Sequence, residues 1–98
     1  MLACVCLNPS FDRTVSLRFF TAGDVNRVLS ARQDVGGKGI NVAITARRLG
    51  IASCVLGCAG KNGIDAVRRK LDGEQVAHVF LPVDGDVRTN MKIVPQDG

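Results

Sequence analysis

The chain has 98 residues and a formal net charge of +4, with 46% hydrophobic and 22% charged residues; this limits it to one domain with a modest core and excludes a disordered tail. No run approaches the ~20 apolar residues of a membrane span and no basic leader precedes the first apolar run, so we expect a soluble, cytoplasmic protein without a membrane partner. We also expect no nucleic-acid partner, because Trp and Tyr are absent and the four Phe are not interleaved with basic residues.

The chain contains four cysteines and a single histidine, His78. Without a secretory signal, we expect the thiols to be reduced. Cys4 and Cys6 should share one strand face, and Cys54 and Cys58 another. Neither pair has histidine partners at zinc spacing, so the sequence predicts buried, unreactive cysteines and no metal site.

Residues 2–7 form a short, almost wholly apolar run, which predicts a strand covered on both faces in a parallel sheet. Asn8-Pro9-Ser10 should end this strand. Asp12 then lies just past its carboxyl end, where open α/β sheets bind their ligands. Its carboxylate is suited to orient sugar hydroxyls, and an Asx-type turn at the strand end is the structural alternative.

Polar and apolar residues alternate over residues 14–20 and again, less regularly, over residues 25–35. This alternation predicts two half-exposed antiparallel strands. Because they are inserted between the first buried strand and the first helix, we expect a small sheet that stands off the main body. An exposed sheet of this kind needs a partner surface.

A glycine-rich stretch, Gly36-Gly37-Lys38-Gly39, opens a run of helical character that continues to Leu49. Glycines at a helix start gather backbone N–H groups and the positive end of the helix dipole, and the lysine adds a full charge. The spacing fits neither a Walker loop nor a dinucleotide fingerprint. It therefore predicts a site for a phosphate ester or a sugar, with a tight turn and a solvated lysine as the alternative.

The elements that follow alternate between strand and helix. Residues 51–58 and 76–81 predict further buried strands, and between them Asn62 should cap an amphipathic helix that ends before Gly73. This order implies right-handed crossovers and a parallel sheet. We expect a turn at residues 82–85.

The last predicted strand covers residues 86–94, where polar and apolar residues alternate. Arg88, Asn90 and Lys92 share one of its faces. A guanidinium with an amide two residues on can hold phosphate and hydroxyl oxygens together, although an exposed polar strand face is the routine explanation.

Four motifs follow one another along the chain. In sequence order they are Asn8-Pro9-Ser10-Phe11-Asp12, Gly23-Asp24-Val25-Asn26-Arg27, Gly36-Gly37-Lys38-Gly39-Ile40-Asn41 and Arg88-Thr89-Asn90. With them the chain resembles, over essentially its whole length, the N-terminal part of the pfkB (ribokinase-like) sugar kinases. Within that family it is most similar to the bacterial 1-phosphofructokinase and tagatose-6-phosphate kinase branch.

The resemblance implies one α/β domain with a parallel, Rossmann-like core at residues 1–11 and 36–83. A small β-sheet lid would take up about residues 12–35 and 84–95. The family often pairs its lids, so a homodimer through the lid strands is expected.

The resemblance also assigns roles to the site residues. Asp12 and Asn41 would hold sugar hydroxyls, and Gly36 and Gly37 would let the sugar approach the backbone.

On the phosphate side, the resemblance implies that Lys38 and Arg88 contact the phosphate of a ketohexose phosphate, with Asn90 beside them. Arg27 would also reach phosphate, in its own or the neighbouring subunit.

The family's Gly-Ala-Gly-Asp motif, which supplies the general base and the anion hole, does not occur in this sequence. We therefore expect the base and most of the Mg-ATP site to lie beyond residue 98, and the chain to be inactive alone. The resemblance implies the sugar-phosphate-binding segment of an ATP-dependent kinase acting on fructose 1-phosphate. A tagatose-6-phosphate kinase and a non-catalytic binding or dimerisation fragment remain as alternatives.

Overall fold

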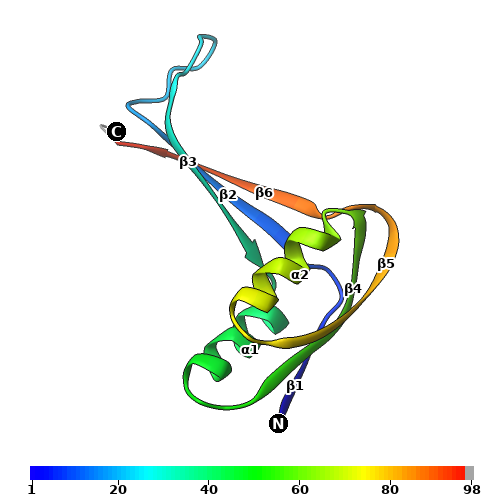
Figure 1. Ribbon diagram of the computed structural model, residues 1–98. Helices are drawn as coiled ribbons and strands as arrows, with labels where there is room; N and C mark the ends of the chain where they lie inside the picture. The colour runs from blue at the N-terminus through cyan, green and yellow to red at the C-terminus, as the bar shows by residue number, and fades with distance from the viewer. Residues whose placement is uncertain (97–98) are drawn as a thin grey trace.

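The computed structural model describes residues 1–96 and consists of two three-stranded sheets and two helices (Figure 1). The α/β fold class, with a parallel core sheet and a small second sheet, is confirmed. In chain order the elements are β1 (Leu2–Cys6), β2 (Ser10–Leu17), β3 (Val28–Gly36), α1 (Lys38–Arg48), β4 (Ser53–Asn62), α2 (Ile64–Gly73), β5 (Ala77–Asp86) and β6 (Arg88–Pro95).

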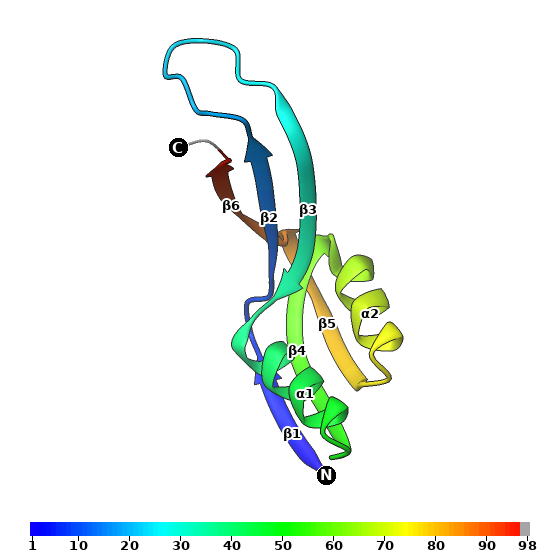
Figure 2. The same cartoon turned by 90° about the vertical axis from the view of Figure 1, so that its left-hand side faces the viewer.

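The core sheet has the order β1-β4-β5 and all its pairings are parallel. Both helices pack on the same face of this sheet, as Figure 2 shows from the side. Parallel strands that follow one another in one direction across a sheet, with right-handed crossovers, put their helices on one side. The opposite face of the core sheet is therefore left without a helix in the described part of the chain.

The core lies between that one sheet face and the two helices. Its largest fully buried side chains are Ile40, Val55, Val67 and Leu71, which come from α1, β4 and α2. Burying an aliphatic side chain of this size stabilises the fold by about 1.5–3 kcal/mol. The helices are therefore held mainly by one shared apolar layer.

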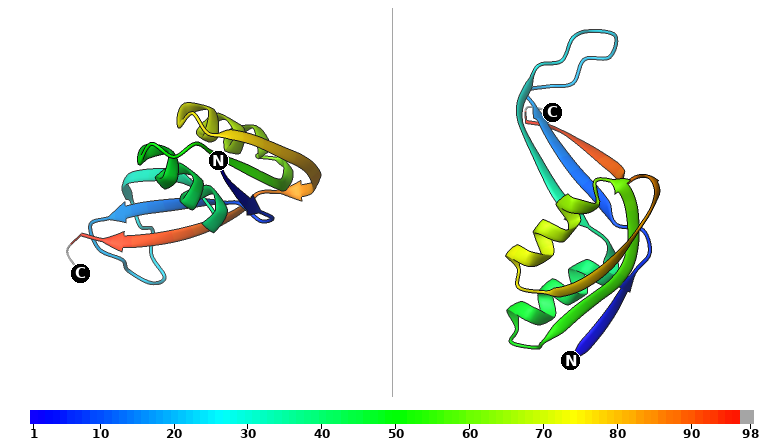
Figure 3. Two further views of the ribbon diagram at one scale, coloured as in Figure 1. Left: turned by 90° about the horizontal axis from the view of Figure 1, so that it is seen from below. Right: turned by 45° about the vertical axis from the view of Figure 1, so that its right-hand side comes forward.

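The second sheet, which we call the lid, has the order β3-β2-β6. Strands β2 and β3 are antiparallel, whereas β2 and β6 are parallel. The lid projects from one end of the core, and the amino terminus lies at the other end (Figure 3). The predicted small sheet is thus present, although β2 begins at Ser10 and not near Thr14.

Two local predictions were wrong. The expected turn at residues 82–85 is part of β5, where Pro82 pairs with Ala59. A proline is tolerated there because β5 is an edge strand of the described sheet. The expected N-cap Asn62 ends β4 instead, and its amide donates to Asp86 Oδ1 at 2.7 Å.

Gly63 takes the N-cap position of α2, with φ 113° and no side-chain cap.

No helix among residues 1–96 is long and apolar enough to cross a membrane.

Cys6, the last residue of β1, lies against the beginning of α1. Its side chain is 5% exposed. Burial raises the pKa of the Cys6 thiol, while hydrogen bonds from the backbone N–H groups of Asn8 and Ile40 act in the opposite direction. Cys4 is buried as well, whereas Cys54 and Cys58 are partly exposed, so the prediction of four buried thiols is right for only two.

Gly57 is the position where the core sheet has least room. A Cβ there would strike the carbonyl oxygen of Cys6 on the neighbouring strand and come within 3.0 Å of the Phe80 ring. We expect Gly57→Ala to lower the free energy of unfolding by about 1–3 kcal/mol in urea melts. Gly73→Ala is the matched control, since a Cβ meets nothing within 4 Å there; in a helix it should stabilise by about 0.5–1 kcal/mol. Equal effects of the two changes would contradict this account.

Cys6 also predicts a pH dependence of stability. The folded chain keeps this thiol protonated to higher pH than the unfolded chain, whose thiol pKa is near 9.0. The stabilisation is therefore complete below that pH and is lost as pH rises above it, with a slope of up to ~1.4 kcal/mol per pH unit. Urea melts between pH 7 and 10 should show a steeper decline for the native chain than for Cys6→Ser, and parallel curves would refute the assignment.

Candidate functional site

The candidate site lies where the lid joins the core. Ser10 of β2 pairs with Gly36 at the end of β3 and with Arg88 at the beginning of β6. Two residues further on, Asp12 pairs with Asn90. Residues directly opposite one another in a sheet share a face. Segments far apart in the sequence are thereby brought to one polar face of the lid, beside the start of α1.

Asp12 is the most firmly positioned side chain of this face. Its Oδ1 accepts hydrogen bonds from Ser10 Oγ and from Asn90 Nδ2, each at 3.1 Å. Gly36 leaves space for the carboxylate, because a Cβ at that position would strike Asp12 Oδ2. Asp12 was expected just past the carboxyl end of the first strand, with an Asx-type turn as the alternative; it lies beyond β1 as the third residue of β2 and not in a turn. The strand resumes at Ser10 because its backbone pairs with both neighbouring strands.

Ser10 was not singled out from the sequence. It is 2% exposed, and its hydroxyl donates a hydrogen bond to the Asp12 carboxylate. The signal that could have revealed it is the alternation of β2, which begins at Ser10 and places residues 10 and 12 on the same face. A buried hydroxyl of this kind fixes a carboxylate without competing for its second oxygen.

The glycine turn leads directly into α1. Gly37 is the N-cap residue, with φ 136° and no side-chain cap, and its carbonyl accepts from Asn41 N at 2.9 Å. Left-handed φ values of this kind favour glycine. Lys38 follows as an exposed first helical residue. A helix start without a side-chain cap keeps backbone donors for an anion.

Two of the predicted site residues lie outside the paired ends of the lid strands. Asn41 is in the first turn of α1 and lines a shallow groove of about 300 Å³ together with Asp34 and Thr45. Arg27 belongs to the loop that joins β2 to β3, which lies at the end of the lid away from the core (Figure 1). The structure thus gathers Asp12, Gly36, Arg88 and Asn90 at one place and puts Arg27 at the other end of the lid.

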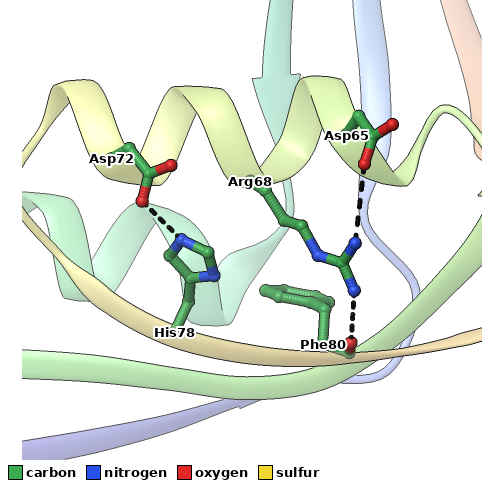
Figure 4. Close-up of polar contacts among 5 residues, drawn as sticks. All are labelled: Asp65, Arg68, Asp72, His78 and Phe80. Carbon is green, nitrogen blue, oxygen red and sulfur yellow. Dashed lines mark hydrogen bonds and ion pairs between the residues drawn. The ribbon is translucent and has the colours of Figure 1, made fainter.

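A second polar cluster joins α2 to β5 and lies outside this site (Figure 4). His78 Nε2 lies 2.7 Å from Asp72 Oδ1, and Arg68 Nη2 donates to the carbonyl oxygen of Phe80 at 2.9 Å. Arg68 also lies 3.5 Å from Asp65 in the same helix. These contacts fasten an edge strand to its helix, so His78 and Arg68 have structural roles here.

Sequence comparison relates the chain to carbohydrate kinases. Residues 6–98 match the family model described as pfkB family carbohydrate kinase. The chain is 38% identical over 93 residues to the 1-phosphofructokinase of Rhodobacter capsulatus and 37% identical over 97 residues to that of Bacillus subtilis. These alignments cover 95% and 99% of this chain, but only 29% and 32% of the relatives. The chain thus spans about a third of their length.

Solved structures agree with this relationship. A Staphylococcus aureus protein provisionally assigned as a phosphofructokinase superimposes with a TM-score of 0.89 at 31% identity, covering 98% of this chain and 31% of its own. Phosphofructokinase-2 of Escherichia coli, solved with substrates and products, has a TM-score of 0.87 over 97% of this chain and 31% of its own, and at 22% identity it shows the fold alone. The chain therefore belongs to the pfkB family of carbohydrate kinases and corresponds to the N-terminal part of their fold.

Proposed function

We propose that the chain is the sugar-phosphate-binding segment of an ATP-dependent kinase of the 1-phosphofructokinase type, which transfers a phosphoryl group to a hydroxyl of fructose 1-phosphate. The observation that carries this proposal is the fixed Asp12 carboxylate, held by Ser10 and Asn90 beside the glycine turn. The names of the curated relatives favour the substrate.

The site residues divide into a sugar side and a phosphate side. Asp12 accepts hydrogen bonds from sugar hydroxyls, because an ionised carboxylate is a strong acceptor. Gly36 and Gly37 let the sugar approach the backbone. Asn41 holds a further hydroxyl from α1. The contribution of this side is positioning, which supplies much of the catalysis in phosphoryl transfer.

Lys38 and Arg88 bind the phosphate that the substrate already carries, and Asn90 lies beside them. Both cations are exposed, so a dianionic ligand can reach them from solvent. Arg27 contributes to phosphate binding only across a subunit boundary, because its loop is at the far end of the lid.

The phosphoryl donor proposed for the complete kinase is Mg-ATP. We assign no catalytic residue within this chain, since its sequence contains no Gly-Ala-Gly-Asp motif. Residues 1–98 on their own should therefore bind the acceptor and not turn it over. In the proposed domain division, the core comprises residues 1–11 and 36–83 and the lid comprises about residues 12–35 and 84–95. The proposed compartment is the cytoplasm.

The lid also has an apolar face, and we propose that a second copy of the chain covers it. This face carries a groove of about 540 Å³ whose lining includes Val15, Leu17, Met91 and Ile93. Met91 is 61% and Ile93 47% exposed. Apolar side chains exposed on a three-stranded sheet favour association.

Sugar-phosphate binding can be tested by NMR titration of the purified chain with fructose 1-phosphate. We expect shifts at the amides of Gly36, Gly37 and Lys38, about tenfold or greater weakening by Asp12→Asn, and no ATP-dependent turnover. The control Asp72→Asn removes a carboxylate from the cluster on α2 and should leave binding unchanged. Tighter binding of tagatose 6-phosphate would favour the alternative kinase, and robust turnover by the chain would refute its assignment as a binding segment.

Lid pairing can be tested by sedimentation equilibrium. The native chain should form a dimer that Ile93→Lys dissociates, because a charge in the apolar groove must be desolvated on pairing. Leu56→Lys, on the core sheet, is the matched control and should leave the dimer intact. A monomeric native chain, or a dimer broken by Leu56→Lys alone, would contradict lid pairing.

A further inference from the structure

The two oxygens of the Asp12 carboxylate have different surroundings. Oδ1 accepts two hydrogen bonds, one from Ser10 Oγ and one from Asn90 Nδ2, each at 3.1 Å. A carboxylate oxygen has two lone pairs, so these two donors saturate Oδ1. Among residues 1–96, no hydrogen bond of the protein ends at Oδ2. Oδ2 is therefore the oxygen that remains for a hydroxyl of a ligand.

The second oxygen lies against the backbone of Gly36, in the space that a side chain would fill there. A Cβ on Gly36 would strike Asp12 Oδ2 and would lie 3.2 Å from Asp12 Cγ and 3.3 Å from Ser10 Oγ. Gly36 immediately precedes Gly37, the N-cap residue of α1. A hydroxyl bound to Oδ2 would thus lie beside the glycine turn.

The backbone register of the lid determines which donors reach Oδ1. Ser10 precedes Asp12 by two positions in β2, so both side chains lie on one face. Asn90 pairs with Asp12 across the parallel strands β2 and β6, which brings these side chains next to one another. Ser10 is 2% exposed, so solvent hardly reaches its hydroxyl. Both donors are therefore in place before a ligand binds.

The Asp12 carboxylate also has a neighbour of like charge. Asp34 of β3 pairs with Asp12 from the other side, and like charges directly opposite one another in a sheet repel. Asp34 forms an ion pair with Arg32 at 3.0 Å, but both side chains are more than half exposed, so the pair contributes little. Without donors on Oδ1, this repulsion would favour rotation of the Asp12 carboxylate away from Asp34.

We propose that Ser10 and Asn90 are positioning residues that hold Asp12 Oδ1, so that Oδ2 alone is a fixed acceptor for one hydroxyl of the sugar phosphate. The inference rests on the function proposed above and gives Asn90 a role on the sugar side of the site. Direct contact of Asn90 with the ligand is the competing role, because its amide has a second proton. An acceptor that is already ordered lowers the entropic cost of binding.

Positioning of the carboxylate can be measured without a ligand. Three-bond scalar couplings from Asp12 Cγ to the backbone nitrogen and carbonyl carbon of the same residue report its χ1 rotamer. We expect one staggered rotamer in the native chain, partial averaging in Ser10→Ala and in Asn90→Leu, and full averaging in the double variant. Ser16→Ala is the matched control, since Ser16 lies on the same face of β2, four residues beyond Asp12. Circular dichroism of each variant verifies the fold.

A double-mutant cycle then tests the link to binding. In NMR titrations with fructose 1-phosphate, Ser10→Ala and Asn90→Leu should each raise the dissociation constant about three- to tenfold, as the loss of one hydrogen bond does. In an Asp12→Ala background the same changes should raise it less than about twofold, because no carboxylate is left to be positioned. Ser16→Ala should leave the dissociation constant unchanged.

A weakening by Asn90→Leu that persists in the Asp12→Ala background would show direct contact with the ligand and overturn the inference. Averaged Asp12 couplings in the native chain, or a single rotamer in the double variant, would also overturn it. If the native chain has a single Asp12 rotamer that the double variant loses, but does not bind fructose 1-phosphate, the positioning role is supported and the proposed substrate is refuted. The two failures are therefore distinguishable.

Discussion

The close approach of the first turn of α1 to the end of β1 is the contact on which the site depends. A side chain at Gly39 would strike the carbonyl oxygen of Val5, and one at Gly37 would come within 2.9 Å of Cys6 Sγ. Only residues without a Cβ let the helix start this close to the strand. The approach sets where the uncapped N–H groups of α1 lie, and hence where an anion can bind relative to Asp12.

The lid depends on the same region, because its strands start and end there. Strand β2 carries Asp12 on one face and Val15 on the other, so a single extended segment serves a polar and an apolar surface. A shift of one residue in its register would exchange the two faces. Pairing of Ser10 with both Gly36 and Arg88 fixes that register at the end where the ligand is proposed to bind.

Much of this arrangement could be predicted from the sequence, because its signals are local. The apolar runs of the core strands, the glycine turn and the alternation in the lid each depend on neighbouring residues. The extension of β5 through Pro82 could not be predicted from neighbouring residues. A strand tolerates a proline at the edge of a sheet, and only the assembled sheet shows which strand is at the edge. Similarly, Asn62 has the residue type of an N-cap but is held in β4 by Asp86.

The hydrogen bond between Asp12 and Asn90 could not be predicted from local sequence patterns either. The two residues are 78 positions apart, and only the parallel pairing of β2 with β6 brings them together. Family resemblance supplied both residues without their contact. Ser10 was missed because a serine after a proline is typical of a turn, and its burial is a property of the packed junction.

The division of the site between lid and core has a mechanical consequence. Asp12 and its partners Ser10 and Asn90 all belong to the lid, whereas Lys38 belongs to a helix of the core. The chain crosses from one body to the other at Pro9, Gly37 and the buried Val87. A rotation of the lid relative to the core would carry the carboxylate and its hydrogen bonds together while changing their separation from the lysine. The distance between the Asp12 carboxylate and Lys38 is therefore set by the angle between the lid and the core.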